Sequence, residues 1–242
     1  MDTPDLVRAA ALHYSFLPKH YNNDHIDVAI EVKPYKLLGG DYCSIFPIDD
    51  HRLVLCLCDV MGHDVAASLL AARINTFVLT QAIAKQCPCH LIESLNSHLC
   101  QRIEQSGMTT TFFSVFIDAE TETKTYAGAG HPPVIHIPHN NRDIQLLESV
   151  TTIVGFDDPM PIGCDVASRT YQPGDKLVLY TDGLIEQQAQ NGKWLQINGL
   201  IDIVGHYQHL DSKPFNNHID QAITEKGYQP RDDILVMTAT LK

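Results

Sequence analysis

The sequence predicts an α+β fold in which antiparallel sheets are stacked and helices form antiparallel pairs. Two observations lead to this class: runs of strands follow one another through tight turns, and helices occur in pairs. The 242 residues contain no linker, low-complexity stretch or internal repeat. We therefore expect one domain, residues 21–242, preceded by a helical segment, residues 1–20.

The first element is a helix over residues 3–16. Thr3 can serve as its N-cap, and Pro4 suits the first helical position, where its missing N–H costs nothing. Apolar residues then recur on one rough face, which is typical of a helix that packs on a core. Pro18 ends the element.

Strands are expected where apolar residues alternate with polar ones, or run together, between turn-forming residues. The segments with this pattern are residues 26–32, 41–48, 52–60, 110–117, 121–126, 134–137, 143–148, 166–171, 175–181 and 233–240.

The remaining helices form two pairs. Asp64 is well placed as the N-cap of a long helix over residues 65–86, which is apolar on most of its faces and should pack against a sheet. A helix over residues 89–105 follows it. The second pair lies at residues 197–205 and 214–226.

Asp59 stands at the end of the most apolar strand. Six apolar residues, 53–58, run into it without a break, which indicates a strand buried on both faces. Burying an isolated carboxylate costs several kcal/mol unless something compensates it. Asp59 therefore needs either a positive partner from elsewhere in the fold or a metal ion.

Other aspartates share this position at a strand end. Asp182 follows a second apolar strand, whereas Asp41 and the pair Asp232-Asp233 each open one. If these ends converge, the carboxylates form a cluster, and oxygen-only ligands select Mg²⁺ or Mn²⁺ over zinc. Each Asp could alternatively cap a turn. Four segments with the same arrangement favour the metal site.

Composition narrows the class of partner. The net charge is −12, and no basic run occurs, which argues against nucleic acid or an anionic membrane as the main partner. No signal peptide precedes the first helix, and no apolar run approaches transmembrane length. The seven cysteines are odd in number, and two lie in the strand over residues 52–60, so we expect reduced thiols and a cytoplasmic protein.

Six motifs in order resemble those of the SpoIIE/RsbU-type branch of the bacterial metal-dependent serine/threonine phosphatases, the PPM or type-2C family. The resemblance extends from about residue 12 to residue 240. The motifs are Gly39-Gly40-Asp41, Asp59-Val60-Met61-Gly62-His63, Ala129-Gly130-His131-Pro132-Pro133, Pro161-Ile162-Gly163, Tyr180-Thr181-Asp182-Gly183-Leu184-Ile185-Glu186 and Asp232-Asp233.

The resemblance implies a four-layer αββα sandwich with two Mn²⁺ or Mg²⁺ ions at one edge. By similarity, Asp59 bridges both ions and the backbone carbonyl of Val60 completes one shell. Asp182 and Asp232 hold one ion, and Asp41 supports the other. Asp233 neighbours a ligand and is the weaker candidate.

The resemblance also implies an enzyme that hydrolyses phosphoserine or phosphothreonine in proteins with a metal-activated water. Asp59 and Asp182 are then catalytic, and no further cofactor is required. The expected substrate is a phosphorylated anti-sigma-factor antagonist, a small STAS-domain protein, in a partner-switching signalling pathway. Residues 1–20 could be the stub of a linker that dimerises in relatives, which leaves a homodimer open.

Two other kinds of protein fit the pattern less well. A catalytically silent pseudophosphatase that serves as a binding module would have no reason to retain these costly carboxylates. A metal-dependent nuclease is disfavoured by the acidic composition.

Some residues depart from the family pattern or have two interpretations. Asp64 stands where relatives usually have Gly, and we expect Asp64 and the helix after it to influence metal occupancy. Leu235 and Ile185 stand where relatives often have Thr. His63 could donate a proton to the leaving group, or it could pack at the start of the helix.

Overall fold

The computed structural model describes residues 3–85, 87–103, 107–139 and 143–242. The chain forms two compact units, each built from several segments. Unit 1 comprises Met1–Leu17, Leu37–Pro132 and Glu148–Thr170, and unit 2 comprises Pro18–Lys36, Pro133–Leu147 and Tyr171–Lys242. The chain passes several times from one unit to the other. The expected boundary between a helical segment, residues 1–20, and a phosphatase domain, residues 21–242, stays a prediction.

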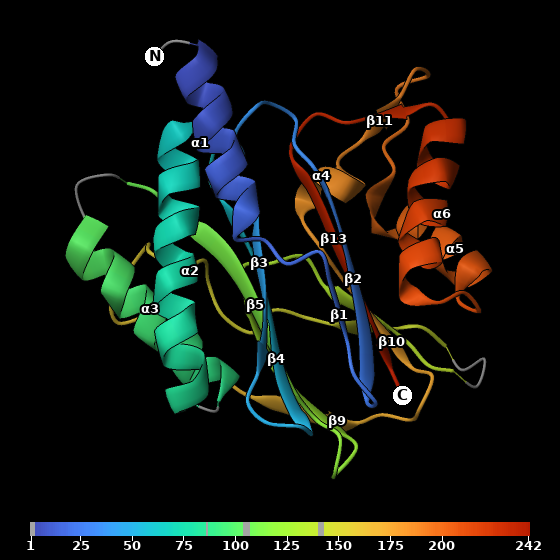
Figure 1. Cartoon of the computed structure of the whole chain (residues 1–242), viewed down its shortest axis with the longest axis horizontal. Coiled ribbons are helices and arrows are strands. Elements are labelled where there is room, and N and C mark those ends of the chain that lie inside the picture. Colours follow the sequence, from blue (N-terminus) through green and yellow to red (C-terminus); the bar gives the residue numbers. More distant parts are fainter. Residues whose placement is uncertain (1–2, 86, 104–106, 140–142) are drawn as a thin grey trace. The chain divides into compact units, whose positions relative to one another are not determined.

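Unit 1 contains a five-stranded antiparallel sheet and three helices (Figure 1). The strands, in spatial order, are β3 (Tyr42–Pro47), β4 (Arg52–Val60), β5 (Thr110–Asp118), β6 (Thr123–Ala129) and β9 (Ala167–Thr170). The helices are α1 (Thr3–Ser15), α2 (Val65–Lys85) and α3 (Pro88–Ile103). Helices α2 and α3 pack side by side against this sheet.

Strand β4 lies inside this sheet, between β3 and β5. Residues 53–58 are all buried, as the unbroken apolar run predicts. Within β4, Arg52 at its start and Asp59 near its end are partly exposed, and Val60 after Asp59 is buried. The carboxylate therefore stands where a buried strand reaches the edge of the core.

Helix α2 begins as predicted. The N–H of Ala67 donates to the Asp64 carboxylate at 3.0 Å, so Asp64 is the N-cap. Its stretch Val65–Ala82 has the length and apolar composition of a membrane-crossing helix, which corrects the expectation that no such run exists. A core helix of a globular protein has the same properties, and Ile74 and Val78 are fully buried.

Unit 2 contains a six-stranded antiparallel sheet with two main helices. The strands, in spatial order, are β1 (His20–Asn22), β2 (Ile26–Lys33), β13 (Ile234–Leu241), β10 (Lys176–Tyr180), β7 (Val134–Ile137) and β8 (Gln145–Leu147). The helices are the short α4 (Asp182–Ile185), α5 (Gln196–Tyr207) and α6 (Ser212–Glu225), and β11 (Gln188–Ala189) pairs with β12 (Tyr228–Gln229). The core of this unit lies between the sheet and α5 and α6, and it includes Val178, Leu200 and Phe215.

The predicted α+β class, with two mainly antiparallel sheets and helix pairs, is confirmed. The long elements occur where expected, although the strand predicted at 121–126 spans Thr123–Ala129. Residues 86 and 104–105 of the predicted helices, and most of the turn at 139–141, lie outside the described residues. The elements that were not expected are β1, α4, β11 and β12, which have two to four residues each.

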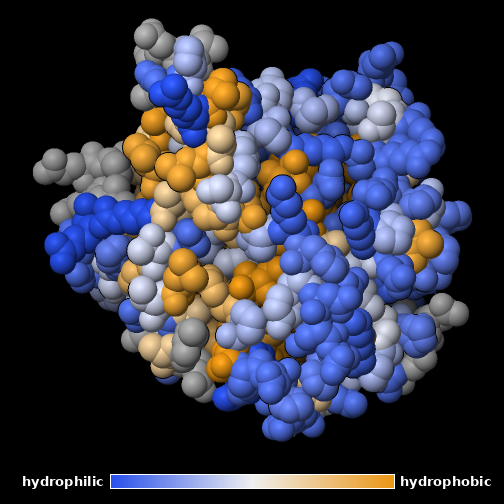
Figure 2. Space-filling model, viewed as in Figure 1, coloured by the Kyte–Doolittle hydropathy of each residue, from blue (hydrophilic) through white to orange (hydrophobic). Residues whose placement is uncertain are grey.

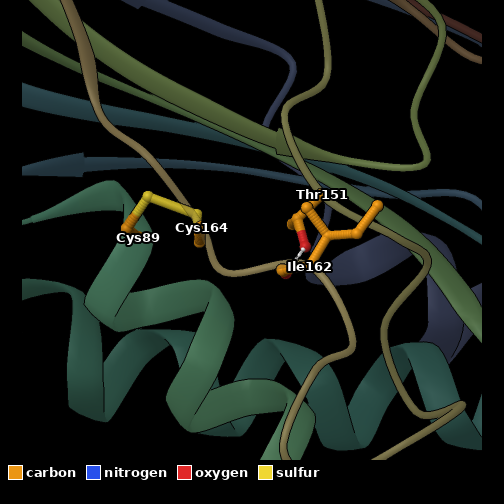
Figure 3. The surroundings of a disulfide bond; sticks show 4 residues. All are labelled: Cys89, Thr151, Ile162 and Cys164. Atoms are coloured by element: carbon orange, nitrogen blue, oxygen red, sulfur yellow. Dashed lines mark hydrogen bonds between the residues drawn. A yellow bond between two sulfur atoms is a disulfide. The ribbon is translucent and has the colours of Figure 1, made fainter.

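The expectation of reduced thiols is wrong for two cysteines. Cys89, at the start of α3, forms a disulfide with Cys164 (Figure 3). Their Cα atoms lie 5.5 Å apart, although 75 residues separate them in sequence. Spacing along the chain could not reveal this pair, because tertiary structure alone brings the two residues together. The other five cysteines, all within the described residues, form no disulfide.

Candidate metal centre

Asp41 and Asp59 lie beside each other at one end of the unit 1 sheet. Strands β3 and β4 are antiparallel and pair Tyr42 with Cys58, so the same register continued by one residue sets Asp41 opposite Asp59. Gly40 confirms that the register continues, because a Cβ atom built on it would lie 2.5 Å from the carbonyl oxygen of Val60. The structure thus brings Asp41 and Asp59 together within unit 1.

The negative charges of Asp41 and Asp59 affect the pKa values of nearby buried cysteines. Burial is the main cause that raises the pKa of Cys58, and the negative charges of Asp59 and Asp41 raise it further. Burial and the charge of Asp41 likewise raise the pKa of Cys43. Asp41 itself is only 5% exposed. The two carboxylates thus generate a negative potential in a region of low dielectric, where a cation is stabilised most.

The carbonyl of Val60 lies at the end of β4, next to this pair. Any side chain at position 40 would collide with it and with the carbonyl oxygen of Gly62, 2.8 Å from the same Cβ position. Glycine at position 40 is therefore required for the close approach of these two backbone segments. His63 follows in the turn between β4 and α2 and is half-buried, a position compatible with both interpretations given above.

Asp182 and Asp232 belong to unit 2 and lie at the ends of two paired strands. Strand β10 pairs with β13, and the pairing extends past the strand end, since the N–H of Thr181 donates to the carbonyl of Leu235 at 3.0 Å. The N–H of Leu235 in turn donates to the Thr181 hydroxyl at 2.9 Å. These two bonds hold Thr181, the residue before Asp182, against Leu235. The backbone that carries Asp182 therefore lies next to the segment that carries Asp232.

Asp233 has a structural role. It is 6% exposed, and its carboxylate accepts the backbone N–H of Tyr35 at 2.7 Å. It therefore holds the segment that follows β2. Asp232 is exposed, and its carboxylate accepts the N–H of Asp233 at 2.8 Å. The two neighbouring carboxylates thus accept from different backbone N–H groups, and only that of Asp232 is exposed. Asp232 is therefore the better candidate ligand.

Glu186 adds a third carboxylate to this group, and the sequence did not identify it as a site residue. Its pKa is raised by partial burial, and further by the charges of Asp182 and Asp232. The spacing of four residues between Asp182 and Glu186, which sets two side chains on one helical face, was the available signal. Three carboxylates within electrostatic reach of one another repel, and a bound cation would relieve that repulsion.

The donor chemistry fits hard cations. The candidate ligands are carboxylate and carbonyl oxygens, which Mg²⁺ and Mn²⁺ prefer. Within the described part of the chain, no three His, Cys, Asp or Glu side chains are already arranged to hold a metal ion. The structure brings Asp41 together with Asp59 in unit 1, and Asp182 together with Asp232 in unit 2.

Comparison with known proteins identifies the family. Residues 49–242 match the family model of Stage II sporulation protein E (SpoIIE). The chain therefore belongs to the SpoIIE family. Phosphoserine phosphatase RsbP of Bacillus subtilis (strain 168) is 24% identical over 188 residues, which are 76% of this chain and 46% of RsbP. Phosphoserine phosphatase RsbU of the same organism is 22% identical over 218 residues, 90% of this chain and 64% of RsbU. The chain thus spans about half to two thirds of the length of these curated relatives.

Solved structures show the same fold. The PP2C domain of SiaA from Pseudomonas aeruginosa superposes with a TM-score of 0.81 at 16% identity, and the match covers 99% of this chain and 96% of that domain. RsbX in complex with magnesium has a TM-score of 0.67 at 17% identity, covering 93% of this chain and 99% of RsbX. The chain therefore has the α+β fold of PP2C-type phosphatase domains, and the resemblance to the SpoIIE/RsbU-type branch is confirmed.

Proposed function

We propose that this protein is a metal-dependent phosphatase that removes phosphate from phosphoserine or phosphothreonine in proteins. The observation that carries the proposal is the pairing of Asp41 with Asp59 beside the Val60 carbonyl, at the positions of two family motifs. The relatives RsbP and RsbU, which are named phosphoserine phosphatases, support the same chemistry.

We propose the metal ligands that the resemblance to the SpoIIE family implies. Asp59 and the Val60 carbonyl, with Asp41 in support, are the unit 1 ligands, and Asp182 and Asp232 are those of unit 2. Two Mn²⁺ or Mg²⁺ ions, when bound, would supply a water of lowered pKa and positive charge for the phosphoryl oxygens. The carboxylates orient that water, and His63 is a candidate to give a proton to the leaving serine or threonine oxygen.

The proposed substrate is a phosphorylated anti-sigma-factor antagonist of the STAS type, and the proposed setting is a partner-switching pathway in the cytoplasm. Similarity to RsbP and RsbU supports this choice. The net charge of −12 agrees with a protein partner better than with nucleic acid or an anionic membrane. The alternative is a pseudophosphatase that binds such a partner without hydrolysis.

Hydrolysis of p-nitrophenyl phosphate and of a phosphoserine peptide tests the proposal. Wild type should turn over both substrates when Mn²⁺ or Mg²⁺ is added and lose the activity in EDTA. Asp59→Asn should abolish turnover, whereas Asp202→Asn, which changes an exposed acid on α5, should leave it unchanged. Wild type that neither hydrolyses these substrates nor binds either metal in calorimetry would contradict the proposal and favour the binding module.

A further inference from the structure

Unit 2 contains an open pocket of about 550 Å³ that includes the last two residues of the motif Tyr180–Glu186. Its size lies within the range of about 300–1,000 Å³ that is usual for ligand sites. The residues that line it come from the end of α4, the segment before α5, and the first turn of α5. They are Ile185, Glu186, Trp194, Gln196, Ile197 and Asn198.

The walls of the pocket are mainly apolar. Ile185 and Ile197 are half-buried there, and Trp194 remains 41% exposed, which is unusual for the largest apolar side chain. Tryptophan is one of the residue types enriched among those that dominate the binding energy at protein interfaces. The pocket thus offers an apolar surface that folding has left partly open to solvent.

The position of Trp194 is fixed by its neighbours. The guanidinium of Arg231 lies 5.1 Å from the centre of the indole ring, within the range of a cation–π interaction. Arg231 also donates to the side chain of Gln188, and Gln188 forms a β-bridge with Trp194. A ring that is held in this way loses little conformational entropy when a ligand binds.

One edge of the pocket is acidic. Glu186 lines it and lies within electrostatic reach of Asp182 and Asp232. Because Glu186 is exposed, a basic side chain of a partner can reach its carboxylate. The pocket therefore joins an apolar wall to a negative edge, within one helical turn of Asp182.

We propose that this pocket selects the substrate by binding a large apolar side chain next to the phosphoserine, with a lysine or arginine of the same segment beside Glu186. An extended chain advances about 3.3–3.6 Å per residue, so an apolar residue a few positions from a phosphoserine held near Asp182 can reach the pocket. The inference rests on the proposed function, and it assigns Trp194 to substrate selection and not to the reaction itself.

Kinetics with phosphoserine peptides test the proposal. One leucine is moved through each of the three positions on either side of the phosphoserine in a background of alanine with one lysine. Wild type should hydrolyse some of the leucine peptides with a higher kcat/KM than the all-alanine peptide. Trp194→Ala should remove this preference, with a loss in kcat/KM of about tenfold, mainly in KM. Its hydrolysis of p-nitrophenyl phosphate should stay unchanged, as it should in Phe156→Ala, which removes an exposed aromatic in unit 1. An equal loss on every substrate, or no loss on any, would overturn the proposal.

A binding measurement separates this inference from the proposed function. Trp194 is the only tryptophan of the chain, so intrinsic fluorescence reports on the pocket in the unmodified protein. In EDTA, the preferred leucine peptide should shift or quench the emission at lower concentrations than the all-alanine peptide. Selective binding without turnover would uphold the pocket and reject the phosphatase. Turnover together with identical fluorescence titrations for the two peptides would reject the role of the pocket in substrate selection and leave the proposed phosphatase function intact.

Discussion

Glycines next to the candidate ligands allow two backbone segments to approach closely. Gly40 precedes Asp41, and Gly183 follows Asp182. A Cβ atom on Gly183 would lie 2.0 Å from the carbonyl oxygen of Asp233, closer than any real contact. The positions of the carboxylates therefore depend on backbone packing between neighbouring segments as well as on the acidic residues.

Gly183→Ala should lower the free energy of unfolding by about 1–3 kcal/mol, because the added methyl group has to displace backbone. Gly205→Ala is a matched control within unit 2. Its Cβ would make only an ordinary contact, 3.7 Å from Ile144, and alanine favours helix α5 by about 0.5–1 kcal/mol. Urea denaturation measures both. A Gly183→Ala variant as stable as wild type would show that the backbone contact is unimportant.

His131 is a buried base without a compensating partner. It is 4% exposed, and neither ring nitrogen has a hydrogen-bond partner among the described residues. Its backbone N–H and carbonyl both bond to the Ser149 hydroxyl, at 3.0 and 2.7 Å, which agrees with a role in holding the turn. Burial lowers the pKa of His131 to about 3.

This shift predicts a pH dependence of stability. Since the pKa in the folded state lies below the value of about 6.5 in the unfolded chain, the neutral ring contributes its full stability above pH ~6.5. The free energy of unfolding should then fall by up to about 1.4 kcal/mol per pH unit as the pH decreases below ~6.5 toward ~3. His131→Phe should reduce this slope, measured by urea denaturation between pH 7 and 4. An unchanged slope would show that His131 is not buried as a neutral ring.

At the scale of elements, Asp64 connects the Asp59 motif to α2. Asp64→Gly removes its charge at little cost to the helix, because glycine is only a few tenths of a kcal/mol worse as an N-cap. We expect this variant to bind Mn²⁺ about two- to fivefold more weakly, since a nearby negative charge is lost. Asp64→Asn keeps the N-cap without the charge. In calorimetry it should show the same loss of Mn²⁺ affinity as Asp64→Gly. Unchanged metal affinity and turnover in Asp64→Gly would refute the role of Asp64.

The Cys89–Cys164 disulfide ties α3 to the segment that carries Pro161-Ile162-Gly163. Because it closes a long loop in sequence, dithiothreitol should lower the free energy of unfolding by about 2–4 kcal/mol. Cys164→Ser should cause a similar loss and become insensitive to the reductant. Cys87→Ser, which changes a free cysteine beside Cys89, should respond to reductant as wild type does. Equal stability of wild type with and without reductant would contradict a stabilising disulfide.

The long elements were predictable because their residues repeat with the period of a helix or of a strand. Asp41, Asp59 and Asp182 could be found because each interrupts or borders a strongly apolar run. Strands β1, β11 and β12 are too short to show a period. The different roles of Asp232 and Asp233 depend on the hydrogen bond from Tyr35, a residue remote in sequence, and the disulfide and the Trp194 pocket depend on tertiary contacts in the same way.

At the scale of the whole molecule, hydrophobic residues are distributed unevenly over the surface (Figure 2). Exposed apolar side chains of unit 1 include Val7 and Leu12 on α1 and Leu69 on α2, each more than half exposed. Orange residues gather on the face that carries α1 and α2 in this view. None of these exposed apolar side chains has a part in the proposed reaction.

The most direct test of the central claim is a double-mutant cycle on metal-dependent phosphate release. The substrates are a phosphoserine peptide and a phosphorylated STAS-domain antagonist, and the variants are Asp59→Asn, Asp182→Asn and the combination of both. If the reaction requires both Asp59 and Asp182, each single variant should reduce kcat to near background, and the double variant should be no worse than either. A single variant that keeps most of its Mn²⁺-dependent activity, or a wild type without any, would contradict the claim.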